Sequence, residues 1–136
     1  YHLPPASILF TAFVLIPLGT VMLEEVAFRS VLWGMLARHA RMWQVLLGSS
    51  LLFGLWHVIP ATASAGNAAI GSALAVFGGH ASVLLVIGTV LFTALGGLVA
   101  GELRRRSGSV LASIGMHWAT NGLGVLFGAV AWGLAV

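Results

Sequence analysis

The chain has 136 residues, of which 60% are hydrophobic and only 7% are charged. Soluble domains carry roughly 25% charged residues, so this chain could not cover its surface with polar groups in water, and its composition indicates a membrane protein. Its formal net charge of +3 comes from arginines in short clusters, without the broad basic face that a nucleic-acid partner requires. The absence of cysteine excludes disulfides and thiolate chemistry.

Long apolar runs without strand-like alternation predict an all-α, polytopic membrane helix bundle. Each run has about the 17 to 25 residues that a helix needs to cross a bilayer, and the first is long enough to be tilted or split. We expect Pro17 to kink or break the first helix and Pro60 to stop the second, because proline lacks the backbone N–H. The four predicted spans are Ala6–Ala37, Met42–Ile59, Ala81–Gly101 and Ser109–Val136.

The arginines predict how these spans are oriented. Arg38 and Arg41 lie between the first and second spans, and Arg104, Arg105 and Arg106 lie between the third and fourth. Four spans place both connections on one side of the membrane, and the positive-inside rule makes that side cytoplasmic. The two ends of the segment are then expected outside.

Small residues are frequent between and within the spans. The segment from Ala61 to His80 is rich in Ala, Gly and Ser, and its composition allows a loop, a short interfacial helix or a re-entrant segment. Two G-x-x-x-G pairs lie in the last two spans, where such pairs let helices approach closely. We expect them to serve packing within the chain rather than oligomerisation, and the oligomeric state stays open: Gly97 with Gly101, and Gly124 with Gly128.

The stretch "LEEVAFR" places three ionisable residues inside the first span, where charges are costly and often functional. Glu25 and Arg29 are four residues apart, in the favourable orientation for a helical ion pair. Glu24 is turned about 100° away on the helix and is not explained by this pair. A purely structural clasp of all three residues is the alternative interpretation.

Two further polar groups lie inside later spans. His57 ends "FGLWH", one turn after Phe53, and could be a hydrogen-bonded packing residue. "HWATN" places His117 and Asn121 on one helical face, where they could stabilise an oxyanion, bond two helices together or bind a ligand. Counted inward from the arginine ends at about 1.5 Å per residue, these groups and Glu24 reach overlapping depths and could share one cavity. Contact with solvent or lipid headgroups is enough to explain the polar residues near the span ends or in loops: His2, His39, His80 and Glu102.

The ordered motifs "EEVAFR", "FGLWH" and "HWATN", each on its own predicted membrane helix, resemble those of the CPBP intramembrane proteases. This family is also called the CAAX protease and bacteriocin-processing, or Abi, family. The resemblance covers roughly Glu24 to Asn121. It implies a single protease core over residues 1–136, with a polar catalytic cavity inside the helix bundle, as part of a longer chain.

The resemblance also assigns roles by motif position. It implies that Glu24 is a general base, activating water for attack on a peptide carbonyl, and that His57 helps to hold this water. His117 and Asn121 would donate hydrogen bonds to the developing oxyanion. The remaining motif residues would support the site structurally: Glu25, Arg29 and Phe53.

Other functions remain open at this stage. Glu24, His57 and His117 are acceptable zinc ligands, but H-E-x-x-H is absent, and we favour a metal-free mechanism with no cofactor. A non-proteolytic bacteriocin-immunity or membrane scaffold protein is a second alternative. Haem ligation by the two histidines would leave "EEVAFR" without a role. The expected partners are membrane lipid and a membrane-associated protein or peptide substrate, whose prenylation stays open, in a bacterial plasma membrane.

Overall fold

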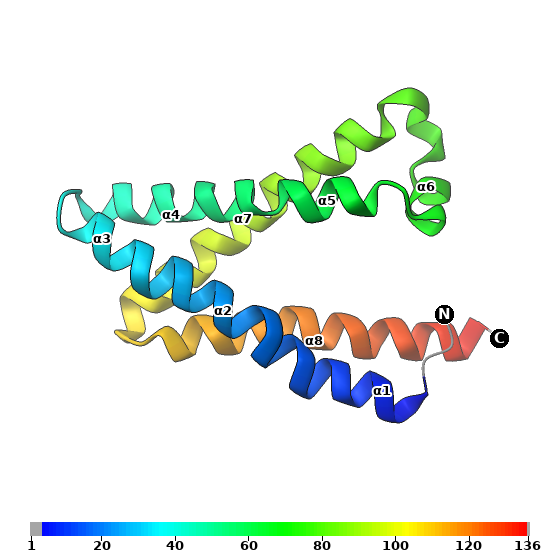
Figure 1. Cartoon of the computed structure of the whole chain (residues 1–136), viewed down its shortest axis with the longest axis horizontal. Coiled ribbons are helices and arrows are strands. Elements are labelled where there is room, and N and C mark those ends of the chain that lie inside the picture. Colours follow the sequence, from blue (N-terminus) through cyan, green and yellow to red (C-terminus); the bar gives the residue numbers. More distant parts are fainter. Residues whose placement is uncertain (1–3, 136) are drawn as a thin grey trace.

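The computed structural model describes residues 4–135, which form helices and contain no strand (Figure 1). His2 and Val136 lie outside the described residues. In chain order the elements are α1 Pro5–Phe10, η1 Thr11–Val21, α2 Met22–Glu25, η2 Val26–Leu32, α3 Trp33–Ala37, α4 Met42–Trp56, α5 Val58–Ser64, α6 Ala68–Ala73, η3 Ala75–His80, α7 Ala81–Ser107 and α8 Val110–Ala135.

Four helices in the described residues are long and apolar enough to cross a membrane, which confirms the predicted number of spans. Their limits differ from the predicted ones because several elements continue through positions where the sequence suggested an end. The four candidate spans are Pro5–Ala37, Met42–Ser64, Ala75–Ser107 and Val110–Ala131.

The first span is one continuous helix, so the predicted break at Pro17 is wrong. η1 contains Pro17 and has π-helical winding, as does η2, and the short α2 lies between them. A proline inside an α-helix removes one hydrogen bond and its ring collides with the carbonyl four residues earlier. The wider π turns accommodate the ring without ending the helix, and such turns are frequent at functional sites.

Pro17 also creates the contact that joins the first span to the last. In the π-helical pattern the carbonyl of Ala12 would accept from the residue five positions later, which is Pro17 and has no N–H. The indole Nε1 of Trp118 in α8 donates to this carbonyl instead, at 2.8 Å. One side chain therefore satisfies the acceptor that the proline leaves free.

The second span runs past Pro60, contrary to the prediction that Pro60 stops it. α4 ends at Trp56, His57 forms a turn with φ −84° and ψ 0°, and α5 continues through Pro60 to Ser64. Pro60 cannot donate to the carbonyl of Trp56, and its ring crowds that carbonyl. The interruption therefore falls at His57, three residues before the proline.

The third span is also longer than predicted, because α7 continues through Arg104 to Ser107. It ends at Gly108, whose φ of +68° is a left-handed conformation that favours glycine. Before α7, the segment between Ala61 and His80 is mostly helical, with the end of α5, then α6 and η3, rather than an extended loop.

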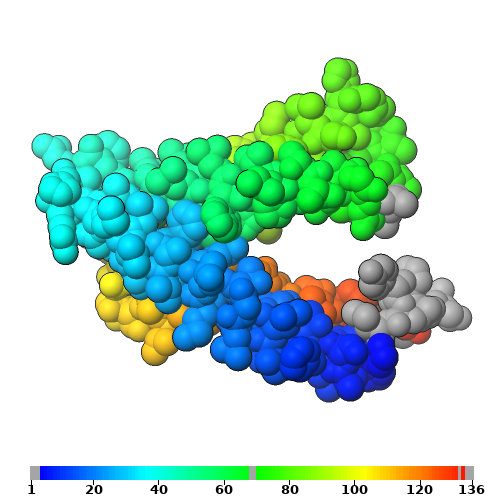
Figure 2. All heavy atoms as spheres, in the orientation of Figure 1, coloured from blue at the N-terminus to red at the C-terminus, as the bar shows by residue number. Residues whose placement is uncertain are grey.

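The helices form two arms that join near α2 (Figure 1). α4 and α5 pack against α7 in one arm, and α8 packs against η1 in the other. Figure 2 shows open space between the part of the molecule that carries α5 and the part that carries α1. The first arginine cluster lies at the turn after α3, and the second directly precedes the turn before α8. Both turns lie at the same end of the molecule, as predicted.

The interior is unusually polar, whereas the exterior is apolar. Large hydrophobic side chains such as Ile59 and Phe92 are each 78% exposed. This arrangement suits a bilayer, where lipid solvates the apolar exterior and buried polar groups must pair with one another. The buried polar side chains are Glu24, Glu25, Arg29, Ser49, Ser50, Ser113 and His117.

Glycines in the first arm allow α4 and α7 to pack closely. A Cβ atom on Gly54 would lie 2.7 Å from the carbonyl oxygen of Val90, and one on Gly101 would lie 2.6 Å from a methyl carbon of Leu46. A Cβ on Gly97 would also meet neighbouring atoms at 3.1 to 3.3 Å. The packing interpretation is thus confirmed for the first G-x-x-x-G pair.

The second pair differs. A Cβ atom on Gly124 or Gly128 would meet nothing within 4 Å. These two glycines therefore do not serve close packing among the described residues, and that part of the packing prediction is wrong.

The close approach of α4 and α7 gives a first prediction. Gly54→Ala would drive a methyl group into the Val90 backbone and should lower the free energy of unfolding in detergent by about 1–3 kcal/mol. Gly88→Ala on α7 is the control, because a Cβ there meets nothing within 4 Å. Thermal unfolding of both variants provides the measurement. Equal unfolding temperatures for the two variants would contradict the packing described.

The contact between Trp118 and the Ala12 carbonyl gives a second prediction. Trp118→Phe leaves a carbonyl unpaired and should destabilise the protein by about 1–3 kcal/mol. In a Pro17→Ala background the helix can supply its own N–H, so the same substitution should cost less. A double-mutant cycle of unfolding free energies measures the difference. If Trp118→Phe lowers the unfolding free energy equally in both backgrounds, Pro17 is not the reason that the Ala12 carbonyl needs an external donor.

Candidate active site

The acidic pair of "LEEVAFR" lies on α2, and both carboxylates are buried. Glu24 is 6% exposed, while Glu25 and Arg29 are 0% exposed. Nη1 of Arg29 lies 3.3 Å from Oε1 of Glu25, so the predicted ion pair is present. In a low-dielectric interior, the pair keeps either charge from being buried alone.

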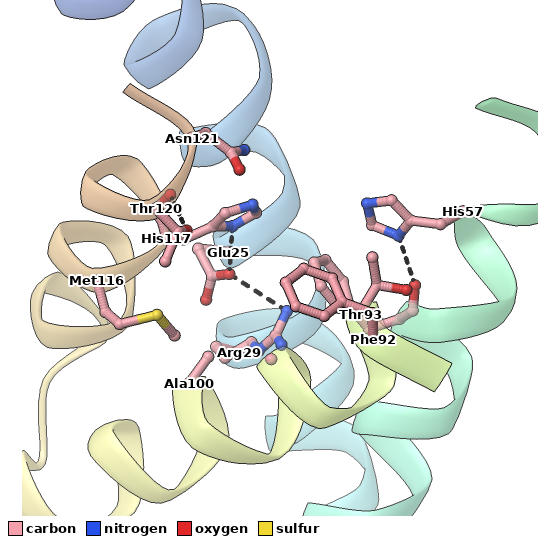
Figure 3. Close-up of a pocket in the computed structure, with 12 residues that line it drawn as sticks. Glu25, Arg29, His57, Phe92, Thr93, Ala100, Met116, His117, Thr120 and Asn121 are labelled. Carbon is pink, nitrogen blue, oxygen red and sulfur yellow. Dashed lines mark hydrogen bonds and ion pairs between the residues drawn. The ribbon is translucent and has the colours of Figure 1, made fainter. Parts of the chain in front are cut away.

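His117 of α8 connects to both carboxylates. Its Nδ1 donates to Oε1 of Glu25 at 2.9 Å, and its Nε2 lies 3.8 Å from Oε2 of Glu24. Figure 3 shows the imidazole of His117 next to the Glu25 carboxylate, with the Arg29 guanidinium on the other side of that carboxylate. Glu25 therefore has a partner on α8 in addition to the one that its spacing predicted.

Glu24 has a different neighbour, which the motif analysis missed. Its Oε1 accepts a hydrogen bond from Nε1 of Trp56 at 3.2 Å, while its Oε2 has no hydrogen-bond partner among the described residues. A Trp N–H in an apolar environment usually finds an acceptor, so the Trp immediately before His57 was an available signal. The second carboxylate oxygen of Glu24 is therefore a buried acceptor that no described residue satisfies.

His57 owes its orientation to the helix interruption described above. The backbone N–H of His57 donates to the carbonyl of Gly54, not to that of Phe53. The freed Phe53 carbonyl accepts instead from Nδ1 of His57, at 2.8 Å. A carbonyl can only accept, so Nδ1 carries the proton, and in the neutral ring Nε2 is left as an acceptor.

The Phe53 ring lies at the centre of the cluster. Its centroid is 4.7 Å from the ring of His57 and 5.6 Å from that of His117, with both pairs near perpendicular. The guanidinium carbon of Arg29 lies 4.0 Å from the same centroid, a cation–π distance. Gly97 leaves room for this stack, since a Cβ there would lie 3.1 Å from Nη2 of Arg29.

These groups border a cavity of about 380 Å³ (Figure 3). The structure brings together His57, His117 and Asn121 around it, with Glu25 as the acidic residue in its lining. Motif analysis did not identify several of the wall residues, which carry no charge and no distinctive spacing. The lining residues are Glu25, Arg29, Phe53, His57, Phe92, Thr93, Gly96, Ala100, Met116, His117, Thr120 and Asn121.

Glu24 borders a second cavity, also of about 380 Å³, together with Trp56 and Thr20. It is thus next to His117 but outside the lining of the first cavity. Asn121 is exposed to the first cavity and makes no hydrogen bond to the described residues. His117 therefore bonds two helices together, as one interpretation of the motif predicted, whereas Asn121 does not.

The residues considered as zinc ligands do not converge. No group of three or more His, Asp or Glu side chains that could hold a metal ion occurs in the part of the chain that the structure describes. Glu24 and His117 are neighbours, but His57 does not join them in a three-residue group, although the bond from its Nδ1 to the Phe53 carbonyl leaves Nε2 without a partner among the described residues. The donor set seen here does not fit a tetrahedral zinc site with three protein ligands.

Comparison with known families agrees with the motif resemblance. The family described as type II CAAX prenyl endopeptidase Rce1-like matches residues 5–123, which contain all three motifs. Searches of curated proteins and of solved structures gave no match. The match spans most of an integral membrane chain in which Glu25, two histidines and an asparagine border one cavity. The chain belongs to the type II CAAX prenyl endopeptidase Rce1-like family.

Proposed function

We propose that this protein is an intramembrane endopeptidase that uses a glutamate-activated water to hydrolyse a peptide bond in a membrane-associated protein or peptide. The observation that carries the proposal is the position of His117. It contacts Glu25 at 2.9 Å, lies 3.8 Å from Glu24 and borders the cavity that also holds His57 and Asn121. Family membership supports endopeptidase chemistry in general.

Water activation is assigned to Glu24 with help from His57. The free Oε2 of Glu24 can accept a proton from water while Trp56 holds Oε1. Nε2 of His57 is an acceptor in the neutral ring and can hold the second proton of that water in a hydrogen bond. The water oxygen then attacks the carbonyl carbon of the scissile peptide.

Oxyanion stabilisation is assigned to His117 and Asn121. With Nδ1–H directed to Glu25, a doubly protonated His117 presents Nε2–H to the developing negative charge. The side-chain amide of Asn121, free of other bonds to the described residues, supplies a second donor.

Collapse of the tetrahedral intermediate completes the reaction. The proton that Glu24 took from water passes to the nitrogen of the departing peptide, and the carbon–nitrogen bond breaks. Glu24 returns to its carboxylate form, and the water oxygen remains in the new carboxyl group. Glu25, Arg29 and Phe53 touch none of the reacting atoms in this scheme and hold the catalytic side chains in position.

The substrate and its membrane follow from the family and the topology. The apolar exterior and the cavity beside α4, α7 and α8 favour a substrate that arrives within the bilayer. By the family resemblance we assign the protein to a bacterial plasma membrane, with the arginine-bearing turns on the cytoplasmic side. A prenylated substrate and an unprenylated peptide are both compatible with this arrangement.

The base assignment yields a third prediction. Glu24→Gln should reduce turnover of a membrane-anchored peptide substrate by about 10²- to 10⁴-fold, because the amide cannot accept the proton. Its unfolding temperature should stay close to that of the wild type, since the amide oxygen can still accept from Trp56. Purified variants in detergent or lipid vesicles allow both measurements.

Glu25→Gln is the matched comparison, because it changes the adjacent carboxylate. It leaves Arg29 buried without a charged partner and should destabilise the fold by about 3–5 kcal/mol. We therefore expect Glu25→Gln to unfold at a lower temperature than the wild type, whether or not it also loses activity. Equal cleavage by wild type and Glu24→Gln would refute Glu24 as the base and would favour Glu25, whereas no cleavage by either would favour a non-proteolytic protein.

The oxyanion assignment yields a fourth prediction. Asn121→Ala should lower kcat by about 10²- to 10³-fold while leaving stability unchanged, because Asn121 has no bond to lose among the described residues. Thr120→Val is the control, since Thr120 borders the same cavity but its hydroxyl donates to the carbonyl of His117. A loss of stability in Asn121→Ala without loss of turnover would show a structural role instead.

A further inference from the structure

The second cavity, beside Glu24, has no role in the scheme above. It shares no lining residue with the active-site cavity, and it combines polar groups with an otherwise apolar wall. The lining residues are Gly19, Thr20, Leu23, Glu24, Trp56, Ile59 and Pro60. A water molecule at such a site needs at least two polar partners, and this cavity offers the Glu24 carboxylate and the Thr20 hydroxyl.

The hydroxyl of Thr20 is available for such a role. Thr11, Thr93 and Thr120 each donate to a backbone carbonyl three or four residues earlier, which is the usual arrangement in membrane helices. Thr20 makes no hydrogen bond to the described residues, although it lies four residues before Glu24 in the same continuous helix. It is exposed and faces the cavity that Glu24 borders.

Thr20 also connects this cavity to the active site. A third cavity, of about 440 Å³, is bordered by Thr20 on one side and by Thr120 and Asn121 on the other. Thr120 and Asn121 in turn border the active-site cavity. Thr20 therefore borders both the Glu24 cavity and the third cavity, and Asn121 borders both the third cavity and the active-site cavity, so the three cavities adjoin along η1, α2 and α8.

The opposite face of the same helix has no such polar cavity among the described residues. An apolar depression there is formed by side chains such as Leu18 and Met22, with no polar side chain in its lining. Hydrocarbon can fill that depression without loss of any hydrogen bond. The cavity beside Glu24 would, in contrast, leave a hydroxyl and a carboxylate unsolvated if lipid filled it.

We propose that water reaches Glu24 through the cavity lined by Thr20 and Trp56, and that the Thr20 hydroxyl is a positioning group for the water that Glu24 deprotonates. This inference rests on the proposed role of Glu24 as general base. It separates the route of water from the cavity that receives the substrate. Substitutions at Thr20 should then alter the chemical step and leave substrate binding unchanged.

The natural absence of cysteine permits a direct test of hydration that does not depend on activity. Single-cysteine variants Thr20→Cys and Leu18→Cys place a thiol on the two faces at nearly the same depth of the helix. A charged, water-soluble methanethiosulfonate reacts with the thiolate, which forms only where water is present. Thr20→Cys in lipid vesicles should react at least about tenfold faster than Leu18→Cys, whose parent side chain is 64% exposed to the apolar face.

Kinetics provide the second measurement. Thr20→Val removes the hydroxyl with little change of shape and should lower kcat by about five- to tenfold with KM unchanged, whereas Thr20→Ser should retain kcat. Equal labelling of Thr20→Cys and Leu18→Cys would overturn the water route, whatever the activities. Unchanged kcat in Thr20→Val would overturn the positioning role. Failure of the proposed function would show separately, as full activity of Glu24→Gln.

Discussion

The structure depends on the burial of one carboxylate, that of Glu25, between a guanidinium and an imidazole. Arg29 lies on the same helix and His117 on α8, so this single group ties two spans together inside a low-dielectric interior. Removal of Arg29 would leave this carboxylate without a charged partner, which costs several kcal/mol in a buried site. The same contact sets the orientation of His117 and so points its second ring nitrogen toward Glu24.

Two prolines shape the backbone around this contact. Pro17 leaves the Ala12 carbonyl free for Trp118, which fixes α8 against the first span. Pro60 displaces the helix interruption to His57, where the freed Phe53 carbonyl orients the imidazole. Arg104 adds a further link, because its Nε donates to the backbone carbonyl of Arg29 at 3.2 Å. The packing of α8 on the first span and the orientation of His57 thus involve backbone carbonyls that lack their usual helical donors.

Sequence patterns predicted the four spans, the common end of the arginine turns and the Glu25–Arg29 pair, because length, charge and helical spacing are local properties. They did not predict that the second span continues through Pro60, and they left open whether Pro17 kinks or breaks the first, because neighbouring side chains satisfy the freed carbonyls only in the folded chain. They also missed the bond from Trp56 to Glu24 and the cavity that contains Thr20. Such contacts join distant segments; the Trp beside His57 indicated that an acceptor was needed, but the sequence did not show that Glu24 would be that acceptor.

The central claim of the proposal is that Glu24 activates water for hydrolysis without a metal ion, and it is consistent with histidines and glutamates that do not form a three-ligand site in the described residues. The most direct test combines metal analysis of the purified protein with cleavage measured after chelation. We expect substoichiometric metal and unchanged turnover of a membrane-anchored peptide. One tightly bound zinc ion per chain, whose removal abolishes cleavage and whose return restores it, would contradict the account.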